Sequence, residues 1–102
     1  MSSTNREAAE KAATDYIGIG HILKELGHGA EGFVFSSTSV TAIKVFTHPE
    51  KYAAELAVYQ RLRDSDVLDV LGFAVPRLIN WSDRLLVIEM TIVQPPFLLD
   101  FS

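Results

Sequence analysis

The sequence predicts an α+β fold in which a five-stranded antiparallel sheet carries one main helix, in the order β-β-β-α-β-β. Runs of β-branched and aromatic residues, separated by short turns that contain glycine or serine, predict the hairpins. A single stretch with helical periodicity lies between the third and the fourth of these runs. The length of 102 residues allows one domain. A hydrophobic fraction of 48% with 22% charged residues is typical of a chain that folds.

The first half of the chain predicts an N-terminal segment and three strands. Residues 1–15 are rich in Ala, Glu, Ser and Thr and are expected as a tail or a short helix. Residues 17–26 mix β-branched residues with glycine, which indicates an irregular strand. Residues 27–32 form a glycine-rich turn, and residues 33–46 are expected as a hairpin that turns at the Ser/Thr-rich segment 36–39.

The main helix is expected to start at the Thr-His-Pro segment, residues 47–49, and to run to about Arg63. Proline is favoured at the first helical position, after a capping threonine or histidine. Leu56, Tyr59 and Leu62 repeat at helical spacing and give one apolar stripe. This stripe predicts the side of the helix that packs on the sheet.

The last two strands are expected at residues 75–80 and 84–93, with a turn at 81–83. Both runs are rich in Ile, Leu and Val, and the Trp-Ser-Asp segment between them has the character of a turn. The prolines of residues 94–96 end the sheet. The stretch VLDVLGF before this hairpin shows no clear periodicity.

The glycine turn matches the pattern G-x-G-x-x-G at Gly27, Gly29 and Gly32. A dinucleotide-binding fingerprint needs a helix directly after the glycines, and a Walker loop needs a lysine where Phe33 stands. Two interpretations remain: an ordinary glycine-bearing hairpin turn, or a hairpin that covers a nucleotide, with Val34 two residues after the last glycine. Glycines suit the second role because backbone N–H groups approach phosphate oxygens best where no Cβ intervenes.

Lys44 is the only charged residue in the strand VTAIKVF, where it shares a face with Ala42 and Phe46. A lysine in this position either extends its ammonium group to water or meets an anion. Glu55 lies beside the apolar stripe of the helix and is the preferred partner, although a helix carboxylate can also simply be solvated. Glu50 competes for the pairing, but it lies in the first helical turn, where it favours the helix dipole. We therefore expect a Lys44–Glu55 ion pair.

Four motifs in order, GHGAEGFV, AIK, YAAELAVYQRL and LLVIEM, resemble the N-terminal lobe of the protein-kinase-like (Ser/Thr kinase-like) fold, interrupted at the hinge. The resemblance implies a tail at 1–15, the kinase-like N-lobe at 16–94, and the exit from the hinge toward a C-terminal lobe at 95–102. It also implies two catalytic residues, Lys44 on the α- and β-phosphates of ATP and Glu55 paired with Lys44. Their separation (55 − 44 = 11 positions) is shorter than usual for eukaryotic kinases, which requires a tight strand-to-helix connection.

The same resemblance implies a nucleotide site under the glycine turn. Ile88 would be the gatekeeper residue behind an adenine slot, and residues 89–91 would form the hinge, where the Glu89 carbonyl and the Thr91 amide bond the adenine edge. Without the resemblance, LLVIEM is a plain buried strand. The implied nucleotide-binding residues are Gly27, His28, Gly29, Ala30, Glu31, Gly32, Val34, Ala42, Lys44, Ile88, Glu89 and Thr91.

In function, the resemblance implies the ATP-binding lobe of a phosphotransferase that transfers the γ-phosphoryl group of Mg-ATP to a hydroxyl acceptor. The catalytic loop and the Mg²⁺ ligands of the family have no counterpart in these residues. The lobe is therefore expected to be incomplete and inactive alone, with the Mg²⁺ ligands in a C-terminal lobe. The alternative is a non-catalytic module, a pseudokinase part or a free-standing N-lobe, that binds protein partners.

Composition argues against several other classes. A net charge of −4 without a basic patch argues against nucleic acid, and no apolar run is long enough to span a membrane. The chain has no cysteine, and His21, His28 and His48 lack the spacing of metal ligands, so no metal site is expected. The polar N-terminus lacks the features of a signal peptide, which predicts a cytoplasmic location.

The end of the chain predicts a contact surface. The cleft side and the C-terminal apolar surface would meet a C-terminal lobe or, without it, a second copy of the chain. The alternative is a tail that folds back over its own sheet. The apolar residues concerned are Ile92, Val93, Phe97, Leu98, Leu99 and Phe101.

Overall fold

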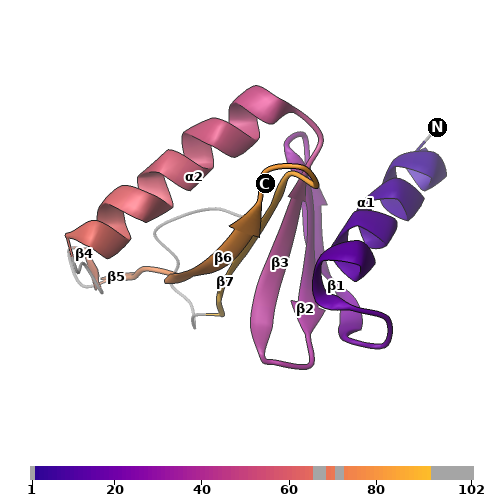
Figure 1. Ribbon diagram of the computed structural model, residues 1–102, viewed down its shortest axis with the longest axis horizontal. Coiled ribbons are helices and arrows are strands. Elements are labelled where there is room, and N and C mark those ends of the chain that lie inside the picture. Colours follow the sequence, from indigo (N-terminus) through magenta and orange to yellow (C-terminus); the bar gives the residue numbers. More distant parts are fainter. Residues whose placement is uncertain (1, 66–68, 71–72, 93–102) are drawn as a thin grey trace.

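A computed structural model describes residues 2–65, 69–70 and 73–92 of the chain. The elements in chain order are α1 (Ser2–Ile17), β1 (Ile22–Gly29), β2 (Gly32–Ser37), β3 (Thr41–Phe46), α2 (Pro49–Asp64), β4 (Asp69–Val70), β5 (Phe73–Ala74), β6 (Leu78–Ser82) and β7 (Val87–Thr91). Five strands form an antiparallel sheet in the order β1-β2-β3-β7-β6, and β4 pairs with β5 separately (Figure 1). The predicted α+β fold with a five-stranded antiparallel sheet is confirmed.

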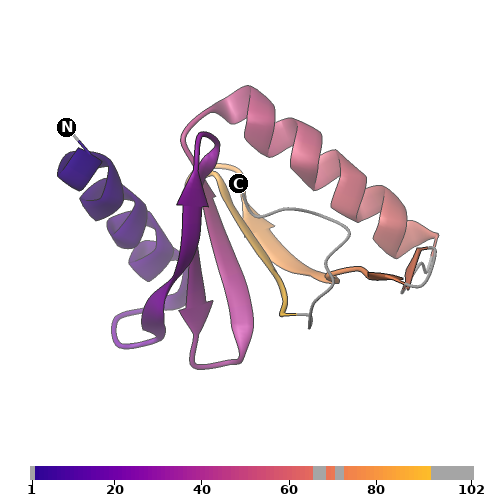
Figure 2. The same ribbon diagram turned by 180° about the vertical axis from the view of Figure 1, so that it is seen from behind.

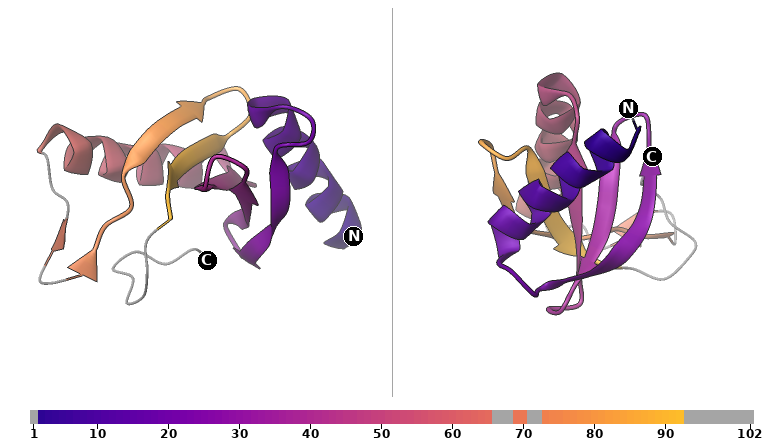
Figure 3. Two further views of the ribbon diagram at one scale, coloured as in Figure 1. Left: turned by 90° about the horizontal axis from the view of Figure 1, so that it is seen from below. Right: turned by 90° about the vertical axis from the view of Figure 1, so that its right-hand side faces the viewer.

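The two helices cover opposite faces of the sheet (Figures 2 and 3). On one face, α2 buries Tyr52, Leu56 and Tyr59 in a cluster with sheet residues. On the other face, α1 buries the small side chains of Ala9 and Ala13. Successive side chains of a strand point to opposite faces, so that β3 contributes to both layers.

The glycine turn is tighter than the sequence predicts. β1 continues through Gly29 and β2 begins at Gly32, so only Ala30 and Glu31 link the two strands. Gly29 pairs directly with Gly32 and closes the hairpin. The predicted turn at 27–32 is too long because strand pairing extends through the glycines, which tolerate a two-residue connection.

β1 is an irregular strand, as its sequence indicates. Its register against β2 shifts between Ile22 and Lys24, and again between Glu25 and Gly27. At the second shift, Leu26 is an extra residue without a partner on β2. Such a β-bulge bends the strand and changes which side chains face each side of the sheet.

The second hairpin turns later than the sequence predicts. β6 includes Trp81 and Ser82, so that the turn occupies residues 83–86 instead of 81–83. Trp81 pairs with Ile88 and packs against the core cluster on the α2 side, which keeps it in the strand. Packing of a large aromatic side chain outweighs the turn character of its neighbours.

Other boundaries also differ from the prediction. The strand expected from residue 17 begins at Ile22, because residue 17 still belongs to α1, and the strands expected from residues 75 and 84 begin at Leu78 and Val87. Ser36 and Ser37 belong to β2 instead of a turn at 36–39, and the buried hydroxyl of Ser37 lies 2.6 Å from that of Thr41. In the N-terminal segment 1–15, expected as a tail or a short helix, α1 forms a helix of 16 residues.

α2 begins and ends close to its predicted positions. Pro49 is its first residue, and His48 occupies the N-cap without a side-chain hydrogen bond to the helix. Glu50 lies in the first turn, where the helix dipole favours a negative charge. Within the described ranges, no helix is long and apolar enough to cross a membrane.

Candidate functional site

The predicted ion pair between Lys44 and Glu55 is present. Lys44 Nζ donates to both carboxylate oxygens of Glu55, at 3.0 Å to Oε1 and 3.2 Å to Oε2. The Lys44 side chain has no exposed surface, and that of Glu55 is 20% exposed. Lys44 lies in the middle of the sheet, opposite Val34 of β2 and Ile88 of β7. Glu50, the competing partner, is exposed at the start of α2.

The buried position of the pair affects its electrostatics. Burial raises the pKa of the Glu55 carboxyl; the Lys44 ammonium opposes this shift, and the Glu31 carboxylate adds to it. Lys44 Nζ also lies 4.8 Å from the centre of the Phe46 ring, a cation–π contact. A cation shielded from water acts strongly on any further anion brought beside it, because the local dielectric constant is low.

Apolar side chains surround Lys44 on the same face of the sheet. Val34, Ala42 and Ile88 are fully buried and belong to one cluster with α2. Met90 is also fully buried there, opposite Ala42; the resemblance placed it in the hinge and not among the nucleotide-binding residues. The alternation that brings Ala42 and Lys44 to one face also brings Ile88 and Met90 together, so the sequence did contain this signal.

Two glycines of the turn differ in what surrounds them. A Cβ on Gly32 would overlap the carbonyl oxygen of Val45, so only glycine fits between β2 and β3 at this point. A Cβ on Gly27 would meet no atom within 4 Å. Gly27 lies opposite Val34, so its open side belongs to the Lys44 face of the sheet. The chain itself does not require glycine at this position, whereas a ligand close to the backbone would.

The tip of the glycine turn approaches the start of α2. The Thr47 amide donates to the Glu31 carbonyl at 3.1 Å. This hydrogen bond joins the tip of the glycine turn to the connection between β3 and α2. The short spacing between Lys44 and Glu55 requires this connection to be tight. Ala30 is exposed at the tip.

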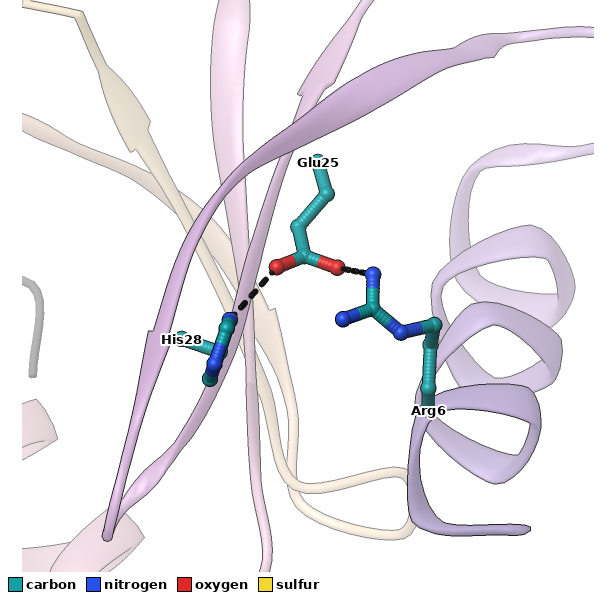
Figure 4. A network of polar contacts seen from close by, with 3 residues as sticks. All are labelled: Arg6, Glu25 and His28. Atoms are coloured by element: carbon teal, nitrogen blue, oxygen red, sulfur yellow. Dashed lines mark hydrogen bonds and ion pairs between the residues drawn. The ribbon is translucent and has the colours of Figure 1, made fainter. Parts of the chain in front are cut away.

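His28 lies on the opposite face of the sheet from Lys44. Its Nδ1 is 2.8 Å from Oε2 of Glu25 (Figure 4). Its ring stacks on that of Phe33, with 5.8 Å between ring centres. Phe33 packs on the α1 side of the sheet. The β-bulge therefore places the His28 side chain on the α1 face of the sheet, away from Lys44, although His28 was predicted to bind the nucleotide.

Residues 89–91, which the resemblance places in the hinge, form the last part of β7. Glu89 pairs with Ile43 of β3 on one side and with Asn80 of β6 on the other. The Thr91 amide donates to the Arg77 carbonyl at 2.9 Å, so it is already bonded within the sheet. β7 extends through Thr91. The role of residues 89–91 as a hinge that bonds adenine stays a prediction.

The Glu89 side chain lies in a polar network that the sequence did not reveal. Its two carboxylate oxygens accept hydrogen bonds of 2.7 Å from the hydroxyl groups of Tyr16 and Thr41. Burial, together with the neighbouring Glu89 carboxylate, raises the pKa of the Tyr16 phenol, which therefore remains a donor at neutral pH. Tyr16 and Glu89 are 73 positions apart, so no local pattern connects them.

Ile92 is half-buried and packs against the cluster on the α2 side. The other residues of the predicted contact surface lie outside the described residues, so self-association stays a prediction. These residues are Val93, Phe97, Leu98, Leu99 and Phe101. Across residues 2–65, 69–70 and 73–92, no three His, Asp or Glu side chains come together as metal ligands would.

No known protein family and no curated protein matches this chain in sequence. Solved structures of aminoglycoside-binding enzymes match it in fold. The ADP-bound aminoglycoside phosphotransferase APH(2'')-Ib gives a TM-score of 0.62 at 18% sequence identity. APH(2")-IIa gives 0.60 in its ternary complex with streptomycin and ATP and 0.59 in its complex with gentamicin, each at 18% identity.

The three alignments cover 86%, 86% and 83% of this chain. They cover only 28%, 28% and 27% of the matched chains, so this chain spans little more than a quarter of their length. In this chain, α2 packs on a five-stranded antiparallel sheet, and Lys44 of β3 is paired with Glu55 of that helix. The chain therefore has the fold of the N-terminal lobe of protein-kinase-like phosphotransferases.

Proposed function

We propose that this chain is the ATP-binding N-lobe of a kinase-like phosphotransferase, which transfers the γ-phosphoryl group of Mg-ATP to a hydroxyl acceptor. The observation that carries the proposal is the buried Lys44–Glu55 pair on the same sheet face as the open side of the glycine turn. The ATP and ADP bound to two of the matched structures support it.

In this proposal Lys44 binds the α- and β-phosphates, and Glu55 holds the ammonium group in place. Phosphoryl transfer depends mainly on positioning and on stabilisation of charge, so a fixed cation contributes directly. The Lys44 side chain has no exposed surface, so a phosphate would reach it only after neighbouring side chains shift. We therefore expect weak ATP binding by the chain alone, with a Kd of the order of 1 mM.

The glycine turn would cover the phosphates, and the apolar face would hold the adenine. The phosphate donors in this proposal are the backbone amides of Ala30 and Glu31, which lie between the two paired strands. The open space beside Gly27 lets the phosphates approach the turn. The adenine wall consists of Val34, Ala42, Ile88 and Met90, which surround Lys44 on the same face. The backbone groups of residues 89–91 are left out because strand pairing already uses them.

The transfer step also needs a base and metal ligands. Because the described residues hold no cluster of acidic or histidine side chains, we assign the Mg²⁺ ligands and the base to a C-terminal lobe of a longer protein. Two of the matched structures contain streptomycin or gentamicin, which carry hydroxyl groups. Hydroxyl-bearing small molecules are therefore the first acceptors to test with a protein that contains both lobes.

The test is an NMR titration of the ¹⁵N-labelled chain with Mg-ATP up to about 10 mM, ten times the expected Kd. Saturable shifts are expected at the amides of residues 27–32 and of β3. Gly27→Ala should weaken binding about ten-fold, because the methyl group occupies the space of the phosphates. Lys44→Gln should abolish detectable binding, whereas Lys24→Gln removes the same charge from an exposed residue of β1 and should leave binding unchanged.

Gly27→Ala keeps the test informative if Lys44→Gln unfolds, since Gly27 has open space around it. Shifts that are absent, or that spread evenly over the chain, would contradict nucleotide binding and favour a non-catalytic protein-interaction module. Equal weakening by Lys24→Gln and Lys44→Gln would show general charge attraction and remove Lys44 from the site.

A further inference from the structure

We propose that Arg6 of α1 is a positioning residue for the glycine turn, acting through Glu25 and His28 from the sheet face opposite Lys44 (Figure 4). The effect of Arg6 on the turn follows from geometry alone. Its effect on nucleotide affinity rests on the proposed function.

The β-bulge at Leu26 brings two side chains of β1 to the same side. In a regular strand, residues three positions apart such as Glu25 and His28 face opposite sides of the sheet. The extra residue reverses the alternation once, so each of them lies opposite a phenylalanine of β2 that packs on the α1 side. The same shift leaves Gly27 opposite Val34, on the Lys44 face.

Arg6 completes the network from α1. Its Nη1 donates to Oε1 of Glu25, and Oε2 of the same carboxylate lies 2.8 Å from Nδ1 of His28. The Phe33 ring contacts both Arg6 and His28. Its centre lies 5.9 Å from Cζ of Arg6 and 5.8 Å from the centre of the His28 ring. The Glu25 side chain is only 18% exposed, so water screens these contacts less than it screens an ordinary surface ion pair.

Arg6 is held in place because other residues of α1 fix this helix against the sheet. Ala9 and Ala13 are buried against the sheet in the middle of α1. Near its C-terminal end, the Tyr16 hydroxyl is bonded to Glu89 of β7. Because these contacts fix α1 on the sheet, the Arg6 guanidinium group does not move together with the glycine turn.

The glycine turn is the part of the sheet that most needs such support. β1 is an edge strand, and only Ala30 and Glu31 connect it to β2. Edge hairpins open locally at a lower free energy than the whole domain unfolds. The network of Arg6, Glu25 and His28, on the α1 face of β1, opposes this opening. It thereby keeps the glycine turn in a fixed position relative to Lys44.

Native-state hydrogen exchange of the ¹⁵N-labelled chain tests the effect on the turn. Arg6→Gln is expected to speed exchange of the amides at residues 29–32 about five-fold relative to those of β3. The matched control is Lys11→Gln, which removes the same charge from the same helix. Lys11 pairs with Asp15 at 3.1 Å within α1 and does not contact the turn, so exchange at residues 29–32 should stay within about two-fold of wild type. Arg6→Lys, which keeps the charge, should restore part of the protection.

A Mg-ATP titration of the same variants tests the effect on affinity. Arg6→Gln should raise the Kd about five-fold, and Lys11→Gln should leave it unchanged. Unchanged exchange at residues 29–32 in Arg6→Gln overturns the positioning role, as does equally faster exchange throughout the sheet. Faster exchange at the turn without ATP binding by the wild-type chain supports the positioning role and contradicts the proposed function. ATP binding that Arg6→Gln leaves unchanged overturns the effect on affinity.

Discussion

The Tyr16 hydroxyl donates a 2.7 Å hydrogen bond to Oε1 of Glu89, which joins the last turn of α1 to the middle of β7. Thr41 of β3 donates to the second oxygen of the same carboxylate at 2.7 Å. Glu89 is 9% exposed, so these hydroxyl groups replace most of the water that a carboxylate normally binds. α1 is therefore attached to the strand next to β3 by a buried polar contact as well as by its alanines.

Removing the Tyr16 hydroxyl should destabilise the chain more than removing a tyrosine hydroxyl whose acceptor is exposed. Tyr16→Phe leaves one oxygen of the buried Glu89 carboxylate without its donor, and we expect a loss of about 1.5–3 kcal/mol. Tyr52→Phe is the matched control, because the Tyr52 hydroxyl donates at 2.6 Å to Asp83, which is exposed and can bind water instead. Its expected loss is about 0.5–1 kcal/mol. Urea unfolding measures both values, and equal losses would contradict a special role for the α1–β7 contact.

Gly32 and Gly27 should respond oppositely to replacement by alanine. Gly32→Ala forces a methyl group onto the Val45 carbonyl oxygen and should lower the free energy of unfolding by about 3 kcal/mol. Gly27→Ala meets open space and should leave stability unchanged or raise it by up to about 1 kcal/mol, because the unfolded chain loses freedom. Thermal unfolding of the two variants compares them directly. A severe loss in Gly27→Ala would mean that the turn is packed more tightly than described.

The tip of the β2–β3 hairpin holds a strained residue. Val40 has a φ of 60° and is 75% exposed, so a β-branched side chain adopts a left-handed conformation without gaining burial. Val40→Asn should stabilise the chain by about 1 kcal/mol, because asparagine tolerates this conformation. Val40→Ala keeps a Cβ and should gain less. A lower melting temperature for Val40→Asn than for Val40→Ala would contradict the assignment of strain.

The tyrosines should make stability fall at high pH. Burial is the largest cause of the raised pKa values of Tyr16, Tyr52 and Tyr59, and neighbouring carboxylates add to it. Because the folded pKa values lie above the ordinary value of 10.0, the stabilisation is complete below pH 10.0 and is lost as the pH rises through the folded values. An absorbance titration of the folded chain should therefore give midpoints above 10.0, and the chain in urea should titrate near it. Midpoints that do not change on unfolding would refute this.

Patterns within single elements, together with the resemblance to the kinase-like N-lobe, predicted the central ion pair. Lys44 follows from the period of two in its strand, and Glu55 follows from its place beside the stripe on the helix. Both periods are local, and the antiparallel order of the sheet brings the two elements together. The same reasoning also reaches Met90, because it alternates with Ile88 in phase.

The features that the sequence did not predict depend on a single residue or on distant pairing. One extra residue, Leu26, changes the side of the sheet on which His28 lies. The composition of β1 indicates an irregular strand but not the position of the bulge. The end of β7 depends on the bond between the Thr91 amide and the Arg77 carbonyl, which local strand propensity does not reveal. The contact between Tyr16 and Glu89 joins elements from the two ends of the chain, so only the folded structure shows it.

The place of β7 in the sheet also has a mechanical consequence. β7 lies between β3 and β6, so any segment that follows Thr91 is joined to a strand bonded on both of its sides. A force along β7 would load the hydrogen bonds to β3 and to β6 in shear at the same time. Separating β7 in this way is harder than peeling an edge strand from the sheet. A torque applied to β7 would therefore rotate the hydrogen-bonded sheet as one body. β1 and its glycine turn lie at the far edge of the sheet from β6 and would be displaced more than β3.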